Sequence, residues 1–253
     1  MKASGYNYSA KSEKGFTVEP NDLIVKVDQP KAVFTQVLFE PNQKLNDSLS
    51  YDITAWALPL AYGVEGYALK NSLGFKTKAS IEITEKTVPQ KVYAFHIPWN
   101  NRISAQVLSL LHQNNIRVRS AMNKAIFGDV TVEPGGLLVT KADNPKVVDF
   151  EKTISDLIKI KTDYNYINTG FSSNAKDVGS ENFNLLKAPK VVLLSGKGVG
   201  STEFGATWFY IQETINYPVS VVEVNNFNRL KLMDYNTLIL ADGDYTFSEE
   251  QQK

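Results

Sequence analysis

The 253-residue chain contains no cysteine, which excludes disulfide bonds, thiolate metal ligands and a cysteine nucleophile. Histidine is almost as scarce, since His96 and His112 are the only two. They do not form a pair with metal-ligand spacing, and neither lies near a Gly-x-Ser-x-Gly nucleophile elbow. We therefore expect no complete hydrolytic site, no metal ligands and no cofactor within this chain.

An excess of charge of either sign is also absent, because 27 Lys and Arg balance 27 Asp and Glu. Sequence-independent binding to nucleic acid needs a basic surface that neutralises phosphates, and no Lys/Arg-rich run supplies one. No apolar run approaches the roughly 20 residues that a membrane-spanning helix needs, and the start, MKASGYNYSAKSEKG, lacks the apolar segment of a signal peptide. We expect neither a nucleic-acid partner nor a membrane span.

What the chain does contain is an internal repeat. The stretch TVEPNDLIVKVDQPKAV at 17–33 returns as TVEPGGLLVTKADNPKVV at 131–148. Agreement at this density indicates a duplication, with copies over about 1–40 and 91–160. The matched pairs are Thr17 with Thr131, Val18 with Val132, Glu19 with Glu133, Pro20 with Pro134, Leu23 with Leu137, Val25 with Val139, Asp28 with Asp143, Pro30 with Pro145, Lys31 with Lys146 and Val33 with Val148.

The repeated unit is predicted to run strand, helix, strand, hairpin, helix. In the second copy the first three elements are an apolar strand over 92–98, a helix over 103–113 that stops at Asn114–Asn115, and an alternating strand over 116–121. A hairpin then follows around Glu-Pro-Gly-Gly, as one joins 16–18 to 22–27 in the first copy.

The closing helix of each copy is predicted to begin near its proline. Pro30 and Pro145 suit a first helical turn, with Asp28 or Asn144 as the cap. One face of each helix is apolar. The residues on these faces are Val33, Phe34, Val37 and Leu38 in the first copy, and Phe150, Ile154, Leu157 and Ile158 in the second.

Both ends of the sequence are expected to fall inside helices. The first copy lacks the opening strand and most of the helix of the second, and Ser248 with Gln251 forms a capping box with few residues after it. We therefore expect an excised piece of a longer protein.

A helical segment is predicted over 50–70, with Trp56, Leu60, Val64 and Tyr67 on one side and bends at Pro59 and Gly63. Two interpretations stay open: a buried connecting helix, or a helix whose Tyr51, Asp52 and Trp56 face a neighbouring domain's site. Residues 161–187 are polar and rich in Asn, Ser and Gly, which predicts a linker or a loop-bearing segment at a domain boundary.

Residues 188–253 alternate strand and helix patterns. Apolar strands at 190–196, 217–224 and 236–243 are separated by a helix that runs through WFYIQETI and by a short helical connection, FNRLKLMDY. This order predicts the first half of a doubly wound parallel sheet. The expected fold class is therefore α/β: a duplicated unit, then a partial parallel-sheet domain.

The turn after the first of these strands holds Gly196, Gly198 and Gly200 ahead of a helix, where phosphate could meet helix amides. Glu223, at the end of the second strand, is placed to anchor a ribose. The spacing differs from Gly-x-Gly-x-x-Gly, however, and Lys197 is misplaced for a Walker A loop. A small-molecule or nucleotide site and a tight turn that needs glycine for its backbone remain alternatives.

Two further positions could carry chemistry. His96 lies near the carboxyl end of its strand on a face with Val92 and Ala94, followed by Trp99, Asn100 and Asn101. Asp242 and Asp244 follow the last strand and could bind a cation or act on a substrate. Each has a structural alternative: a partnered core histidine, and an Asp-Gly turn. His112, at a helix end where a cation is favoured, is expected to be structural.

Four phrases together resemble one family: YDITAWALPLAYGVEGYA, FHIPWNNRISAQVLSLL, VEPGGLLVT and PKVVLLSGKGVGSTEFGATWFY. They resemble the region after the catalytic domain in large bacterial zinc carboxypeptidases of the carboxypeptidase A superfamily, over about residues 16–245. In that family α/β accessory segments follow the peptidase domain, and a domain similar to class I glutamine amidotransferases comes last.

The resemblance implies a parent protein that is exported to the periplasm or the cell exterior and removes C-terminal residues from peptides with zinc. The family's His-x-x-Glu zinc motif has no counterpart, because Ile-Pro-Trp follows His96 and Gln-Asn-Asn follows His112. The amidotransferase cysteine is missing too. The resemblance thus implies a non-catalytic accessory region whose partner is the peptidase domain of the same polypeptide. An independent enzyme with a pocket that gathers His96, Asp52 and Asp242 remains an alternative.

Overall fold

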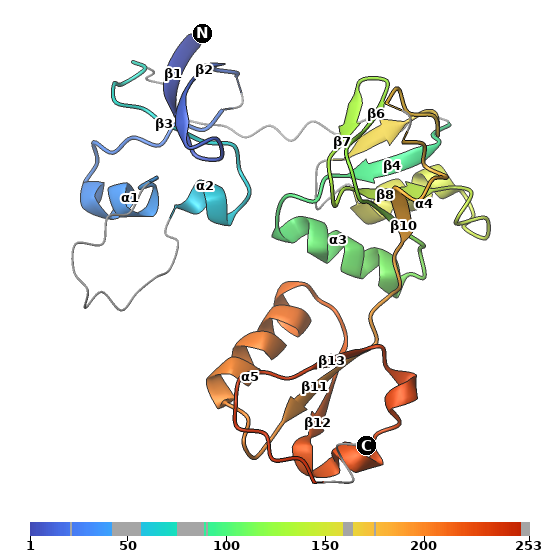
Figure 1. The fold of residues 1–253 in the computed structure, drawn as a ribbon. Coiled ribbons are helices and arrows are strands. Elements are labelled where there is room, and N and C mark those ends of the chain that lie inside the picture. The colour runs from blue at the N-terminus through green and yellow to red at the C-terminus, as the bar shows by residue number, and fades with distance from the viewer. Residues whose placement is uncertain are drawn as a thin grey trace. The chain divides into compact units, whose positions relative to one another are not determined.

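The computed structural model describes residues 1–20, 22–41, 57–74, 89, 91–158, 164–174 and 176–248. Tyr51, Asp52 and Trp56 lie outside the described residues. The chain forms two compact units, Met1–Lys86 and Thr87–Lys253, and both combine helices with small sheets (Figure 1). The predicted mixed α/β character is confirmed. In the described part no helix is both long and apolar enough to cross a membrane.

The first unit is built on a small antiparallel sheet. Its strand order is β2-β1-β3, with Asn7 opposite Ser12 across the turn and a stacked pair of rings, Phe16 and Tyr67, whose centroids lie 4.0 Å apart. The strands are β1 (Lys2–Asn7), β2 (Ser12–Thr17) and β3 (Tyr67–Ala68), and the helices are α1 (Ala32–Leu38) and α2 (Leu58–Ala61).

The predicted hairpins are wrong, because in neither copy do the two predicted strands pair with each other. Residues 12–17 pair with the preceding strand β1, and 22–27 form no strand. In the second copy β7 (Val130–Val132) pairs with β6 (Ala125–Phe127), and β8 (Leu137–Thr140) joins a different sheet. In both copies the first predicted strand pairs with the strand before it, and only in the second copy does the second strand find partners, β4 (Ala94–Ile97) and β5 (Arg119–Ala121).

The helical segment predicted over 50–70 is much shorter in its described part. Helix α2 begins after Ala57 with Pro59 in its first turn, where the missing N–H costs nothing. Its continuation stops at Gly63, which has a φ of 62°. Tyr67, expected on the same helix, lies in β3 instead. Proline and glycine thus delimit the helix rather than bend it.

The second unit is centred on a five-stranded sheet in which every described pairing is antiparallel. The order is β10-β5-β8-β4-β9, so β8 and β4 (Ala94–Ile97) are flanked on both sides. The remaining strands are β5 (Arg119–Ala121), β9 (Asn165–Ile167) and β10 (Phe183–Leu185). The sequence predicts a linker or a loop-bearing segment over 161–187. Two short strands of the sheet, β9 and β10, lie within this range and form the two sheet edges, where polar side chains remain solvated.

Two amphipathic helices pack on one face of this sheet. Helix α3 (Arg102–Gln113) starts at Asn101, whose Oδ1 accepts hydrogen bonds from the amides of Ile103 and Ser104, and it stops at the left-handed Asn115 (φ 58°). Helix α4 (Phe150–Ile158) starts later than predicted. Asn144 does not cap it, since its buried side chain accepts from the Arg117 amide (2.7 Å) and donates to the Arg117 and Thr140 carbonyls (2.9 Å each).

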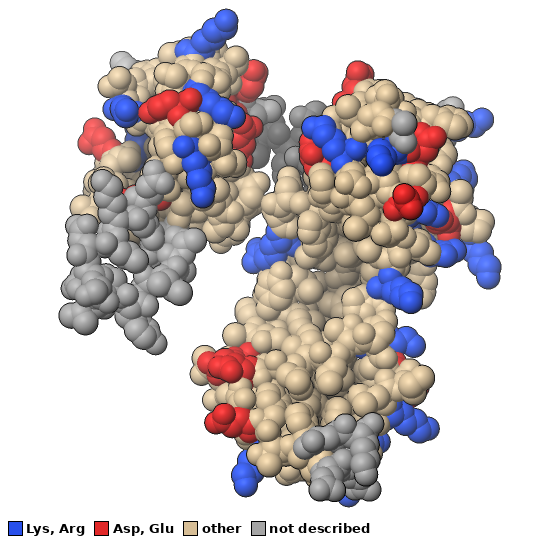
Figure 2. Space-filling model, viewed as in Figure 1, with Lys and Arg blue, Asp and Glu red and all other residues tan. Residues whose placement is uncertain are grey.

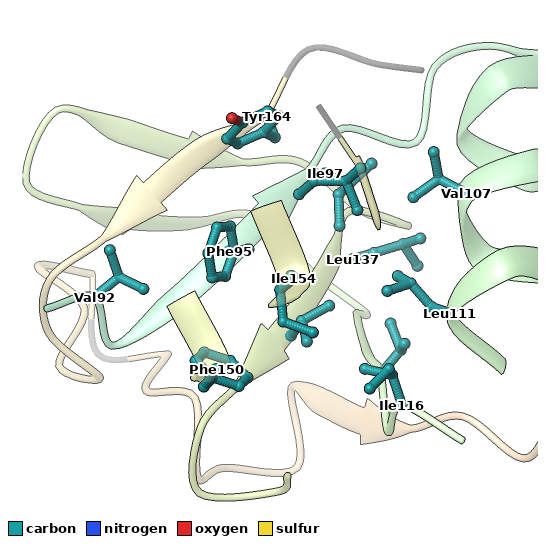
Figure 3. Close-up of a cluster of buried hydrophobic side chains, with 13 residues drawn as sticks. Val92, Phe95, Ile97, Val107, Leu111, Ile116, Leu137, Phe150, Ile154 and Tyr164 are labelled. Carbon is teal, nitrogen blue, oxygen red and sulfur yellow. The ribbon is translucent and has the colours of Figure 1, made fainter. Parts of the chain in front are cut away.

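The core between helices and sheet is centred on Phe95 (Figure 3). Its ring meets that of Phe150 edge-on at 5.7 Å between centroids, and that of Tyr166 at 5.5 Å. Val92 joins this cluster, contrary to the predicted alternation, because β4 begins only at Ala94. The opposite face carries a second cluster with the β6–β7 hairpin: Ala94, Ala121, Ala125, Phe127, Val132, Leu138, Ile167, Val178 and Phe183.

The C-terminal part of the second unit contains a three-stranded parallel sheet, as the strand pattern predicts. The order is β12-β11-β13, with β11 in the middle. Its strands are β11 (Val191–Ser195), β12 (Val219–Glu223) and β13 (Thr237–Ile239). The connections are α5 (Ser201–Trp208), which continues as the π-helix η1 (Phe209–Thr214), and the 3₁₀ turns η2 (Val224–Arg229) and η3 (Leu232–Asp234).

The first prediction concerns the core around Phe95. Phe150→Ala should lower the free energy of unfolding by about 3–5 kcal/mol, because it removes a side chain that is 1% exposed and leaves a cavity. Val148→Ala is the matched control: that side chain is 79% exposed, so the change should stay within about 0.5 kcal/mol. Urea unfolding followed by circular dichroism measures both. Equal effects would contradict the assigned core.

Candidate functional site

His96 lies on β4, an interior strand of the five-stranded sheet, on the face opposite Phe95. Its side chain is 3% exposed, and neither ring nitrogen has a hydrogen-bond partner among the described residues. A Cβ on Gly136 would lie 2.9 Å from both the Glu133 carbonyl oxygen and Val132 Cγ1, and 3.2 Å from His96 Nε2, so the glycine packs closely beside the ring. Burial lowers the pKa of His96 from 6.5 to about 4, which makes the ring neutral at pH 7.

The position of His96 does not follow the rule for parallel sheets. Strand β4 runs antiparallel to both β8 and β9, so its carboxyl end is not the edge where open α/β sheets place ligands. The rule therefore gives no reason to place a ligand site at His96. The ring is buried, as the structural alternative required, but the partner that this alternative assumed is absent from the described residues.

Trp99 and Asn100 follow β4 and reach the surface. Trp99 is 45% exposed and packs against Gly135, the neighbour of the glycine beside His96. Asn100 accepts a hydrogen bond (3.0 Å) from Asn101, which caps α3. The structure thus brings Trp99 and His96 to adjacent glycines, whereas Asn100 belongs to the helix cap.

His112 lies in the last turn of α3 and is 9% exposed. Burial lowers its pKa as well, and its Nε2 has no partner within the described part of the chain. The cation expected at this helix end is therefore disfavoured, because desolvation opposes the attraction of the helix dipole.

The glycine turn after β11 is closed by the chain's own backbone. Gly196 and Gly198 have φ values of 96° and 89°, which side chains rarely adopt. The Gly200 amide donates to the carbonyl of Asp242 (2.9 Å), and the Asp244 amide donates to that of Gly198 (2.7 Å). A Cβ on Gly198 would collide with the Asp244 carbonyl oxygen. These contacts account for the glycines without a ligand.

Carboxylates surround the same turn. The Glu203 carboxylate fills the space beside Gly200, and the Cβ of Glu223 lies 3.6 Å from where a Cβ on Gly196 would stand. Asp242 accepts the amide of Gly243 (3.0 Å), as the Asp-Gly turn alternative expected. A phosphate would meet negative charge here, which opposes the favourable helix N-terminus. The described residues include no group of three His, Cys, Asp or Glu placed to hold a metal.

One ion pair was not anticipated from the sequence. Arg119 on β5 binds Asp143 through two nitrogens, at 2.6 and 2.8 Å, and also donates to the Phe183 carbonyl (3.0 Å). Thr140 donates to the same carboxylate (2.7 Å). The Arg119 hydrogen bonds lower the pKa of Asp143 below its usual value. Asp143 belongs to the repeat, which is the only sequence signal that marked it, and the pair joins three strands rather than facing a cleft.

A pocket of about 390 Å³ lies in the first unit, lined by Lys2–Gly5, Glu13 and Leu69–Leu73, and it contains none of the expected site residues. The face shown in Figure 2 carries charges of both signs among broad uncharged areas. The structure therefore does not gather His96 and Asp242 in that pocket.

Comparison with known proteins yields no relative: the chain has no significant match to a family model, to a curated protein or to a solved structure.

The second prediction tests whether the turn glycines serve the backbone. Gly198→Ala should lower the free energy of unfolding by about 2 kcal/mol or more, through its positive φ and the collision with Asp244. Gly205→Ala, in α5 with open space around it, should raise that free energy by about 0.5–1 kcal/mol. Chemical denaturation compares the two. A silent Gly198→Ala variant would refute the backbone role.

The third prediction concerns pH. The folded pKa of His96 lies below its unfolded value, so its contribution to stability is present above about pH 6.5 and is lost as the pH falls toward 4. The expected loss is about 3 kcal/mol, measured as urea midpoints between those pH values. His96→Gln should flatten this dependence, and His112→Gln should retain most of it. An unchanged slope in His96→Gln would show that other groups cause it.

Proposed function

We propose that this chain is a non-catalytic accessory region of a zinc carboxypeptidase-like protein, which packs beside the peptidase domain and shapes access to it. The parent protein would remove C-terminal residues from peptides in the periplasm or outside the cell. The parent, its zinc and its location rest on the resemblance of the sequence phrases. The non-catalytic role rests on the geometry.

The observation that carries the proposal is the closed carboxyl edge of the parallel sheet. Doubly wound sheets bind ligands at this edge, between the loops that follow the strands. Here the loops after β11 and β13 bond to each other at Gly198 and Gly200, and carboxylates line the turn. The same loops that would form a site therefore act as a structural joint.

Polar side chains of α3 give the second unit a further internal contact. Gln106 donates to the Thr214 carbonyl (2.5 Å), and Ser109 and Gln113 both donate to that of Asn216 (2.8 and 2.6 Å). The Thr214 carbonyl ends the helix formed by α5 and η1, where backbone acceptors have no partner within the helix, and Asn216 follows two residues later. These hydrogen bonds hold α3 against the end of the α5–η1 helix, which favours the rigid second unit that a packing module requires.

The sheet also offers an apolar end that a neighbouring domain could cover. Trp99 and Met122 are 45% and 56% exposed. Gly135 contacts Trp99 and donates its amide to the carbonyl of Ala121 (2.7 Å), the residue before Met122. Exposed aromatic and methionine side chains are enriched where protein surfaces meet.

The fourth prediction follows from this proposal. The purified chain, supplied with zinc, should release no amino acid from a panel of peptides with free C-termini, because both histidines are buried and the described residues include no group placed to hold the metal. Mass spectrometry of the peptides detects any release. A zinc-dependent release that survives repurification, and that disappears when zinc is removed, would overturn the proposal.

A further inference from the structure

Residues 22–27, with the sequence DLIVKV, form an exposed apolar segment in the first unit. Leu23, Ile24, Val25 and Val27 are 61%, 42%, 50% and 48% exposed, although such residues are usually buried. The backbone groups of Leu23, Ile24 and Val25 have no hydrogen-bond partner among the described residues. An apolar run with unpaired backbone groups is a template for strand pairing.

The repeat shows how the same motif behaves when it is paired. Leu23 and Val25 correspond to Leu137 and Val139 of β8, which are 2% and 0% exposed. Strand β8 has β4 on one side and β5 on the other. Residues 22–27 form no strand, and none of the described strands of the first unit pairs with them.

The charges of the segment indicate which neighbour fits. Asp22 and Lys26 are symmetric about Ile24, and both are exposed. In an antiparallel pair centred on Ile24, Asp22 of one strand lies opposite Lys26 of an identical strand, twice, and Leu23 lies opposite Val25. A parallel, in-register pair would place like charges together instead. Opposite charges directly across an antiparallel pair stabilise it, and like charges destabilise it.

We propose that residues 22–27 are a homodimer interface, in which two copies of this chain pair these segments antiparallel about a two-fold axis at Ile24. Such an interface is self-complementary, as a two-fold axis requires. Helix α1 follows directly and adds the exposed side chains of Val33 and Phe34 (76% and 60%) to the apolar surface that can be buried. The proposal does not depend on the proposed function.

The fifth prediction tests the interface through its charges. The full chain should change from monomer to dimer over about 1–100 µM in sedimentation equilibrium. Lys26→Asp should raise the dissociation constant at least about tenfold, since two acidic pairs would face each other. Asp22→Lys should do the same. The double variant Asp22→Lys with Lys26→Asp should restore dimerisation, because it recreates both pairs with their signs exchanged.

The matched control is Lys146→Asp, which makes the same charge change at an exposed position of the second unit and should leave the dimer intact. Circular dichroism confirms that each variant is folded. A chain that stays monomeric at the highest concentration would overturn the proposal. So would a dimer that tolerates Lys26→Asp, or a double variant that remains as weak as the single ones.

Discussion

The packing of α3 and α4 against one face of an antiparallel sheet organises most of the second unit. Phe95, fully buried on β4, meets aromatic rings from α4 and from the edge strand β9. Close-packed aromatic contacts of this kind stabilise beyond the area they bury, and they fix the register of the strands that carry them. Because β4 is held by β8 and β9, the alternation of its side chains sends His96 to the opposite face.

Burying His96 on that opposite face costs free energy. A buried imidazole without a partner loses hydrogen bonds to water that nothing described here replaces. The ring stays neutral, which limits the cost but makes the sheet sensitive to acid. Gly136 accommodates the ring on one side, and the adjacent Gly135 accommodates Trp99. Two neighbouring glycines of the repeat thus serve packing, where the first copy has Asn21 and Asp22.

Local sequence patterns predicted where helices and strands lie better than they predicted which strands pair with each other. The 3.6-residue periodicity and the Asn101 cap located α3, and the apolar face of α4 packs as expected, with Phe150 and Ile154 buried. Pairing partners are not encoded locally: 137–140 resembles half of a hairpin until β4 and β5 are present on either side. The sequence could not decide between a ligand site and a tight turn at the glycines 196–200, because the backbone that closes this turn comes from residues 242–244, far along the chain.

The repeat shows why pattern alone does not decide burial. The segments at 23–25 and 137–139 share their apolar positions, yet the first is exposed and the second lies in an interior strand of a sheet. A strand has no stability of its own, since its backbone groups require a neighbour and its side chains require a facing layer. The difference between the copies therefore lies in what surrounds them. The second copy folds onto two strands and two helices of its own unit, whereas the segment at 22–27 has no paired strand among the described residues.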